Sequence, residues 1–219
     1  LSTVGIGPNG GYQITQGNNP DVSSGKVSNY IVREFSHVVT DEENNTVTTV
    51  EKFQGVYEFT MNYTMEMSLY SQSTSGNPFY SIDFNEKTDS GDVRVGGTIR
   101  IRPDVVEFNG FTDKMNSVSI EGTTEHSLKV TFDTVNDTIA VVVDGKEIVT
   151  RNSSLNDIDS VDYVRIGDMK RMEAGSYINI QSINYTEKES AASITTKAVL
   201  NNLPAKLADE VDRVTENIT

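Results

Sequence analysis

Between residues 57 and 69 the chain alternates strictly, with an apolar residue at every odd position and a polar one at every even position. Successive side chains of an extended chain point to opposite faces, so this stretch predicts a β-strand with one buried and one solvated face. Burial of one face is typical of antiparallel sheets. Because the stretch exceeds the usual strand length of about 5–6 residues, we expect a bend or bulge within it.

Shorter extended runs, separated by turn residues, continue to about residue 186. We predict further strands at residues 28–37, 79–84, 97–102, 105–109, 117–121, 127–133, 138–143, 146–150, 161–167 and 176–185. No stretch with helical spacing separates them, which excludes a parallel sheet with crossover helices. The pattern predicts an all-β fold, a two-sheet antiparallel jelly-roll sandwich.

The spacing of apolar residues changes after residue 189. Leu203, Leu207, Val211 and Val214 follow one another at intervals of three or four, which predicts a helix over residues 204–217. A shorter helix is expected within residues 190–200. We therefore divide the chain into a β-sandwich domain, residues 1–189, and a C-terminal helical extension, residues 190–219. The extension is equally compatible with a connector and with a terminal helix packed on the sandwich.

The composition excludes several partners and kinds of site. The 219 residues carry a net charge of −14, which disfavours nucleic acid and anionic membrane surfaces. No apolar run approaches the roughly 18 residues of a membrane span. There is no cysteine, so thiolate metal sites and cysteine nucleophiles are excluded. There is also no tryptophan, so a ring that stacks on sugars must be Tyr or Phe.

One segment suggests a family. Residues 127–149 read as a strand, a turn, a strand ending in Asp144-Gly145 and a short third strand; residues 164–167 and 177–185 supply two later strands. Together these pieces resemble the laminin-G-like and concanavalin A-like jelly-roll modules attached to secreted bacterial polysaccharide-active proteins. The resemblance implies a carbohydrate-binding module outside the cell or on its surface, acting as a monomer on a polysaccharide or other glycan.

A catalytic motif is not apparent. Glycosidases with this sandwich carry Glu-x-Asp-x-x-Glu on one strand, and the nearest match, residues 80–86, lacks the first Glu. Strand alternation places Asp83 and Glu86 on opposite faces, so we expect Asp83 to be exposed or metal-linked and Glu86 to lie in a turn. His37 and His126 have no neighbouring nucleophile and no metal-ligand spacing. We therefore expect a chain without catalytic activity.

Two arginines are the first candidate for glycan binding. In residues 97–102 the alternation places Ile99 and Ile101 on the core face, and Arg100 and Arg102 side by side on the other. Two guanidinium groups could bind hydroxyls or a uronate carboxylate. The alternative is a solvated face balanced by nearby carboxylates. Tyr80 is the nearest ring in the sequence, and Tyr70, Phe79 and Phe111 are further candidates for stacking.

A group of oxygen ligands is the second candidate. Asp83, Asn85, Asp89 and Asp92 crowd one stretch and offer the ligands that calcium prefers. Their spacing matches no standard calcium loop, and a plain polar turn is the alternative.

These observations favour a non-catalytic carbohydrate-binding module of an extracellular bacterial polysaccharide-active or cell-surface protein. Two alternatives remain open: a structural or adhesive domain of a surface or phage fibre protein, and a divergent polysaccharide lyase or glycosidase.

Overall fold

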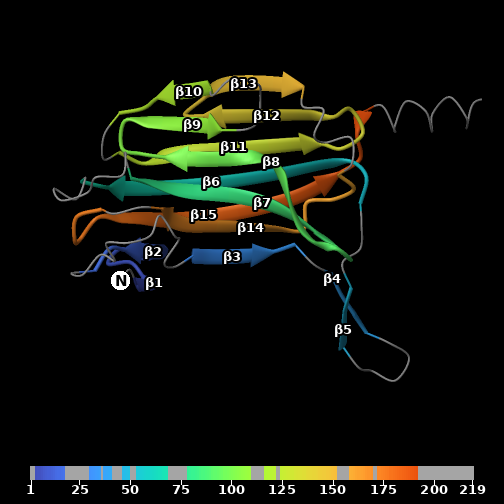
Figure 1. Ribbon diagram of the computed structural model, residues 1–219, viewed down its shortest axis with the longest axis horizontal. Coiled ribbons are helices and arrows are strands. Elements are labelled where there is room, and N and C mark those ends of the chain that lie inside the picture. The colour runs from blue at the N-terminus through green and yellow to red at the C-terminus, as the bar shows by residue number, and fades with distance from the viewer. Residues whose placement is uncertain are drawn as a thin grey trace, which may run out of the picture.

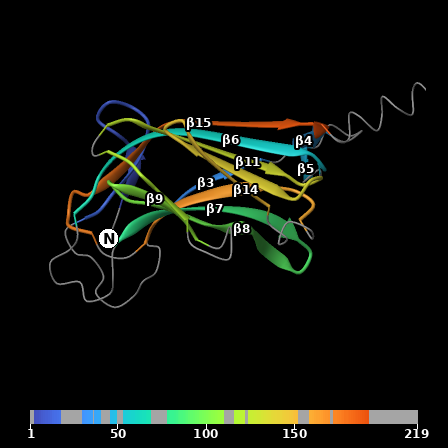
Figure 2. The same cartoon turned by 90° about the horizontal axis from the view of Figure 1, so that it is seen from above.

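The computed structural model describes residues 3–17, 30–35, 37–40, 46–49, 53–68, 78–109, 116–121, 124–151, 158–169 and 172–191. Within them the chain forms strands β1 to β15, and every pair of neighbouring strands is antiparallel. Two sheets lie face to face as two layers (Figure 2). The two-sheet antiparallel jelly-roll sandwich expected from the alternation is confirmed.

The first sheet has seven strands in the order β1-β2-β15-β6-β11-β12-β13 (Figure 1). Their bounds are β1 Thr3–Ile6, β2 Tyr12–Thr15, β15 Tyr177–Lys188, β6 Val56–Glu66, β11 His126–Asp133, β12 Thr138–Val143 and β13 Lys146–Arg151.

The second sheet has six strands in the order β10-β9-β8-β7-β14-β3. Their bounds are β10 Asn116–Ser119, β9 Val105–Asn109, β8 Gly91–Ile101, β7 Phe79–Thr88, β14 Tyr163–Met169 and β3 Tyr30–Glu34.

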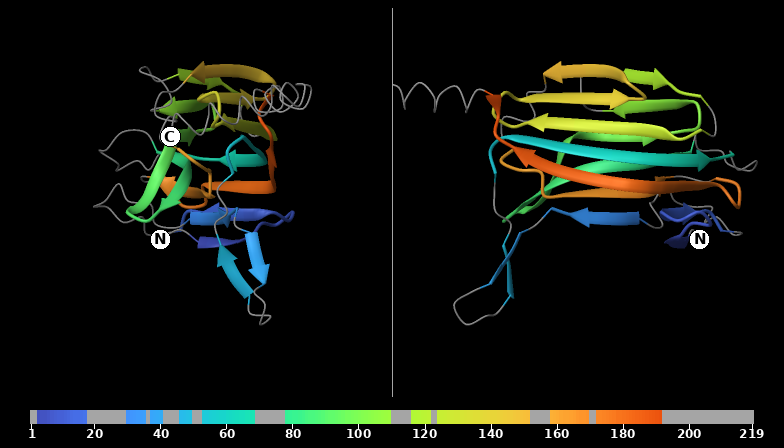
Figure 3. Two further views of the ribbon diagram at one scale, coloured as in Figure 1. Left: turned by 90° about the vertical axis from the view of Figure 1, so that its right-hand side faces the viewer. Right: turned by 180° about the vertical axis from the view of Figure 1, so that it is seen from behind.

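A separate hairpin joins β4 (His37–Thr40) to β5 (Thr46–Thr49). It projects from one end of the sandwich, away from both sheets (Figures 1 and 3). The sequence pattern predicted a single strand over residues 28–37, whereas the chain forms β3 and then turns into this hairpin.

The core lies between the sheets and is built by the predicted alternation. In β6 the odd residues from Tyr57 to Met65 are buried, and the even ones face outward. Phe84 of the six-stranded sheet joins the layers, because its ring meets Phe59 and Phe132 of the seven-stranded sheet edge-on, with centroids 5.1 and 4.9 Å apart. Such aromatic pairs stabilise the sandwich beyond their buried area.

The expected bulge occurs beside the long strand, not within it. The pairing of β15 with β6 shifts between Ile180 and Ser182, so Gln181 of β15 is the extra residue, while β6 itself runs without interruption. A second shift occurs between Asp83 and Asn85 of β7, opposite Gly96 of β8, whose φ is 71°. Glycine suits this position because its backbone adopts positive φ without a steric penalty.

The hairpin between β12 and β13 confirms the predicted Asp-Gly turn. Asp144 and Gly145 have φ values of 48° and 78°, as a two-residue turn of type I′ requires. Asp144 also accepts hydrogen bonds from the ring nitrogen Nδ1 of His126 at 2.6 Å and from the backbone N–H of Ser127 at 2.9 Å. The turn is thereby tied to the start of β11.

The helix predicted over residues 204–217 lies outside the described residues, as does most of the extension from residue 190. Among the residues that are described, no helix is long and apolar enough to cross a membrane.

Candidate functional site

The six-stranded sheet turns alternate residues away from the core, and strand pairing aligns them in rows. One row runs Tyr30, Gly167, Ser81, Arg100, Glu107 across β3, β14, β7, β8 and β9. The next row runs Val32, Arg165, Asp83, Thr98. A third contains Glu34, Tyr163, Asn85 and Arg94. We call the surface formed by these three rows and the adjoining Phe79 and Arg102 the outer face.

Arg100 lies near the middle of this outer face with its charge available. Its guanidinium carbon is 4.7 Å from the ring centroid of Phe79, in a cation–π contact. Its Nε atom is buried and has no hydrogen-bond partner. No ion pair found within the described part of the chain includes Arg100. A guanidinium held in this way can bind an anionic or hydroxyl group from outside the chain.

Arg102 differs from Arg100, although both point to the same side of β8. Its Nη1 donates to Oε1 of Glu107 at 2.7 Å, and its Nε donates to the carbonyl of Pro78 at 3.3 Å. The side chains of this pair are only 18% and 12% exposed. The side chain of Arg102 is therefore already bound within the sheet. The sequence suggested that the two arginines are equivalent, whereas their partners in the structure differ.

Asp83 is a buried carboxylate that lies between two arginines. It is 4% exposed and accepts a 2.7 Å hydrogen bond from the hydroxyl of Thr98. Arg94 and Arg165 each place a guanidinium nitrogen 3.5 Å from one of its oxygens. Two guanidinium groups therefore face this one carboxylate. The expectation that Asp83 is exposed is wrong, because β7 is a central strand and its outward side chains are covered by their neighbours.

Tyr163 adds a protonated hydroxyl to the same face. It donates a 2.6 Å hydrogen bond to Asp92. Burial first, and then this bond and the charge of Asp92, raise the pKa of Tyr163 to about 12, while Arg165 acts in the opposite direction. The hydroxyl is therefore protonated at neutral pH.

The ring available for stacking is Tyr30 and not Tyr80. Tyr80 is completely buried between the sheets, because it pairs with Ile101 on the core side of β7. Tyr30, on the edge strand, is 50% exposed, and the guanidinium of Arg165 lies 5.4 Å from its ring centroid. Phe79 is buried beneath Arg100. Tyr70 and Phe111 lie outside the described residues.

The proposed calcium ligands are not gathered around one point. Asp83 is held by Thr98, Arg94 and Arg165, and the amide of Asn85 donates to the backbone carbonyl of Asp83 at 3.3 Å. Asp92 lies in β8 and accepts from Tyr163, while Asp89 occupies the turn between β7 and β8. Across the described ranges, no three acidic or histidine side chains are placed to hold a metal ion.

One other sequence-based assignment is wrong. Glu86 lies in β7 and not in a turn; it is 3% exposed and accepts hydrogen bonds from the backbone N–H groups of Asp159 and Ser160. His126, for which the sequence offered no neighbouring nucleophile, is 2% exposed and paired with Asp144 of the turn between β12 and β13. The side chain of His37 is not among those described.

Sequence reasoning missed Tyr30, Arg94, Arg165 and Tyr163. These residues lie on three different strands, and only strand pairing brings them to one face. Only the alternation of apolar and polar residues along this strand could have indicated one of them, because it places Arg165 on the outward face while Val164 and Ile166 face the core.

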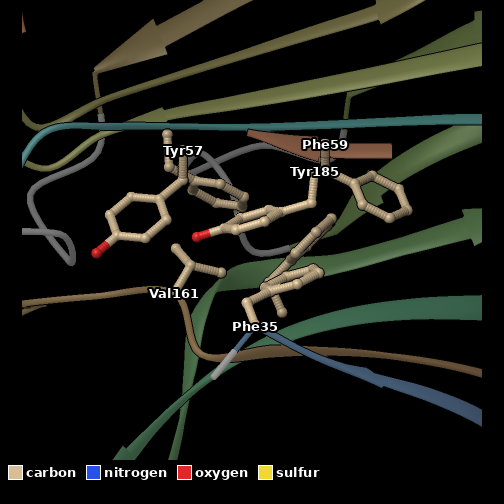
Figure 4. A pocket seen from close by; sticks show the side chains of 7 residues that line it. Phe35, Tyr57, Phe59, Val161 and Tyr185 are labelled. Carbon is tan, nitrogen blue, oxygen red and sulfur yellow. The ribbon is translucent and has the colours of Figure 1, made fainter. Parts of the chain in front are cut away.

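An aromatic pocket too small to hold a water molecule lies between the sheets near the end of β15 (Figure 4). It is lined by Phe35, Tyr57, Phe59, Phe84, Phe132, Val161 and Tyr185. The rings of Phe35 and Tyr185 stack in parallel with centroids 3.7 Å apart. The hydroxyl of Tyr185 donates a hydrogen bond to Oε1 of Glu187 at 2.5 Å. Ligand sites are usually larger, at about 300–1,000 Å³, and have converging polar groups, so we assign this pocket to core packing.

Comparisons with known proteins identify the fold. No protein-family model matches the sequence, and no curated protein matches it. Among solved structures, alginate lyase A1-II′, a member of polysaccharide lyase family 7, matches with a TM-score of 0.57, 8% identity and coverage of 85% of this chain and 83% of that one. A variant of this lyase in complex with its substrate GGMG matches with a TM-score of 0.58, 9% identity and coverage of 85% and 82%.

A sialidase matches with a TM-score of 0.56 and 10% identity, over 85% of this chain and 16% of that one. At these identities the likeness shows the fold alone. It nevertheless contradicts the expectation of a chain without catalytic activity, because the alginate lyase structures match over most of both chains. The absence of the Glu-x-Asp-x-x-Glu motif excludes the catalytic arrangement of those glycosidases. It does not exclude other kinds of enzyme.

Proposed function

We propose that this protein binds an acidic polysaccharide on the outer face of its six-stranded sheet. The observation that supports this most is Arg100, a cation stacked on Phe79 with no carboxylate partner among the described residues. A uronate carboxylate would accept hydrogen bonds from its guanidinium in the paired geometry that arginine favours. Arg100 would thus bind one charged group of the polymer.

The row that contains Arg100 supports an extended ligand. Tyr30 lies three strands away from Arg100, about 14 Å at the usual strand spacing, and only the small residues Gly167 and Ser81 lie between them in the row. A sugar ring stacked on Tyr30 and a carboxylate on Arg100 would belong to different units of one chain. This geometry favours a polymer over a single sugar.

The two arginines beside Asp83 support an anionic ligand. Arg94 is 51% exposed and Arg165 is 35% exposed, so both can contact a polymer that crosses the second row. The net charge of −14 opposes approach from a distance. At physiological salt the screening length is about 8 Å, so local arginines dominate once the polymer is in contact. A protein with this ligand would act outside the cell or on its surface.

The test is calorimetry with oligomers of a polyuronate. A few hydrogen bonds and one stacked ring correspond to about 4–8 kcal/mol, a dissociation constant between millimolar and micromolar. We expect Arg100→Gln to weaken binding at least about tenfold, which corresponds to 1.4 kcal/mol. Lys129→Gln, on the opposite sheet, is the matched control and should bind like the parent. Equal affinities for Arg100→Gln and the parent would refute the proposed site.

A second candidate function is cleavage of the bound polymer by β-elimination, which Tyr163 favours. In this reaction the C5 proton leaves, a C4=C5 double bond forms, and the C4–O bond to the leaving sugar breaks. The leaving oxygen then takes a proton, which the hydroxyl of Tyr163 could supply, while the carboxylate of Asp92, hydrogen-bonded to that hydroxyl at 2.6 Å, could accept the C5 proton. Arg165, in the neighbouring row, would bind the uronate carboxylate.

Ultraviolet absorbance of unsaturated uronates measures this reaction directly. The expected result is product formation by the parent and none by Tyr163→Phe, with oligomer affinity retained in both. If the parent binds polyuronates but releases no unsaturated product from any of them, the elimination is refuted and the binding function stands.

A further inference from the structure

Strand β1 forms one edge of the seven-stranded sheet (Figures 1 and 3). It pairs with β2 on one side, and within the described ranges no strand pairs with its other side. All four of its residues are exposed. An exposed edge of this kind can pair with another strand, and proteins usually protect such edges with charges, proline or bulges.

The β1 edge has none of these protections within its four residues. The first 20 residues of the chain include no Asp, Glu, Lys or Arg. Two other edges are charged, since β3 exposes Arg33 and Glu34, and β13 exposes Lys146 and Glu147; the edge strand β10 is, like β1, uncharged. For a chain with a net charge of −14, β1 is therefore an edge where a second acidic copy can approach with little local repulsion.

Apolar side chains extend from the core to this edge. Val4 pairs with the buried Ile14, and Ile6 pairs with Tyr12, so all four point toward the core side of the sheet. Val4, Ile6 and Tyr12 are nevertheless 43%, 72% and 56% exposed. Removing them from water would stabilise any assembly that covers them.

We propose that β1 pairs in antiparallel register with β1 of a second copy of this chain. A two-fold axis through Gly5 would place Val4 opposite Ile6 of the partner subunit, and the reverse, so the edge is complementary to itself. Gly5 is suited to the axis, because nothing lies within 4 Å of the position that its Cβ would occupy. The proposal replaces the monomer implied by the family resemblance, and it does not depend on the glycan site.

Sedimentation equilibrium of the 219-residue chain tests the dimer. We expect a monomer–dimer equilibrium whose dissociation constant rises at least about tenfold in Ile6→Lys, because the two-fold axis applies each substitution twice. Val135→Lys is the matched control, since Val135 is also apolar and 38% exposed but lies in the turn after β11. A monomeric parent, or a dimer that Ile6→Lys does not weaken, would overturn the proposal.

Cross-linking tests the register. The chain has no cysteine, so Gly5→Cys introduces a single thiol that would face its copy across the axis. We expect rapid disulfide-linked dimers under mild oxidation, and none from Asn184→Cys on the exposed face of β15. If Gly5→Cys cross-links no faster than Asn184→Cys, the two-fold axis does not pass through Gly5 and the register is wrong.

Discussion

Neighbouring residues with the same chemistry have different roles because their partners differ. Arg100 and Arg102 are two positions apart on one strand and face the same way, yet Arg102 is paired with Glu107 and Arg100 is stacked on Phe79. Nothing in their immediate sequence distinguishes them. Strand pairing places Glu107 of β9 directly opposite Arg100, yet its carboxylate accepts a hydrogen bond from Arg102, two residues further along β8.

The two arginines should therefore separate stability from binding. Arg102→Ala leaves the buried carboxylate of Glu107 without its partner, which should cost about 1–3 kcal/mol of unfolding free energy and leave polyuronate affinity nearly unchanged. Arg100→Ala should weaken binding and change stability little. Urea titrations and calorimetry of both variants measure this, and parallel effects in the two variants would contradict the assignment.

The two faces of β6 should respond differently to truncation. Phe59 is 1% exposed and contacts Phe84 of the other sheet, so Phe59→Ala should cost about 3–5 kcal/mol. Thr60→Ala, on the outward side, should stay within about ±0.5 kcal/mol. Denaturant titration measures both, and similar losses would mean that the assigned register is incorrect.

At the scale of elements, the extent to which sequence predicts structure depends on whether the cause is local. Alternation within β6, and the hairpin at Asp144-Gly145, follow from side-chain direction and turn chemistry of adjacent residues. The bulges at Gln181 and at Gly96 depend on how each strand pairs with its partner, which lies beyond its own sequence. The same limit applies to the site. Arg100 was predictable on its face, and the alternation of β7 itself places Tyr80 on the core side. Tyr30 was missed because β3 reaches the outer face only through β14.

The stability of the β12–β13 hairpin should depend on Gly145 only because its backbone adopts a positive φ. At Gly145 φ is 78° and nothing lies within 4 Å of the position that a Cβ would occupy, so a new side chain meets no steric obstacle. Gly145→Val should still cost about 1–2 kcal/mol, since a β-branched residue is strained at positive φ. Asparagine tolerates this conformation, so Gly145→Asn should lose less unfolding free energy than Gly145→Val. Equal melting temperatures for Gly145→Val and the parent would contradict the turn.

At the scale of the whole molecule, several buried tyrosines link stability to alkaline pH. Burial first raises the pKa of Tyr57, Tyr63 and Tyr185 well above 10.0, with the nearby carboxylates of Glu187 and Asp144 adding to the shift. In the unfolded chain these groups ionise near pH 10, whereas in the folded protein they stay protonated. Above that pH the unfolded state binds fewer protons, so unfolding free energy falls as pH rises.

Tyr63→Phe tests this linkage. The hydroxyl of Tyr63 is buried without a hydrogen-bond partner, so its removal should have little effect near neutral pH. Because phenylalanine cannot ionise, the fall in urea midpoint above about pH 10 should be shallower in the variant than in the parent. An equally steep fall in both proteins would show that Tyr63 does not contribute.

The most direct test of a glycan site on the outer face is backbone amide NMR during titration with a polyuronate oligosaccharide. We expect the largest shift changes along the row of Tyr30, Gly167, Ser81 and Arg100, with smaller changes at Arg165 and Asp83. The outward residues of the seven-stranded sheet, including Thr60 and Asn184, should not respond. Changes concentrated on that sheet, with none along the Arg100 row, would contradict a glycan site on the outer face.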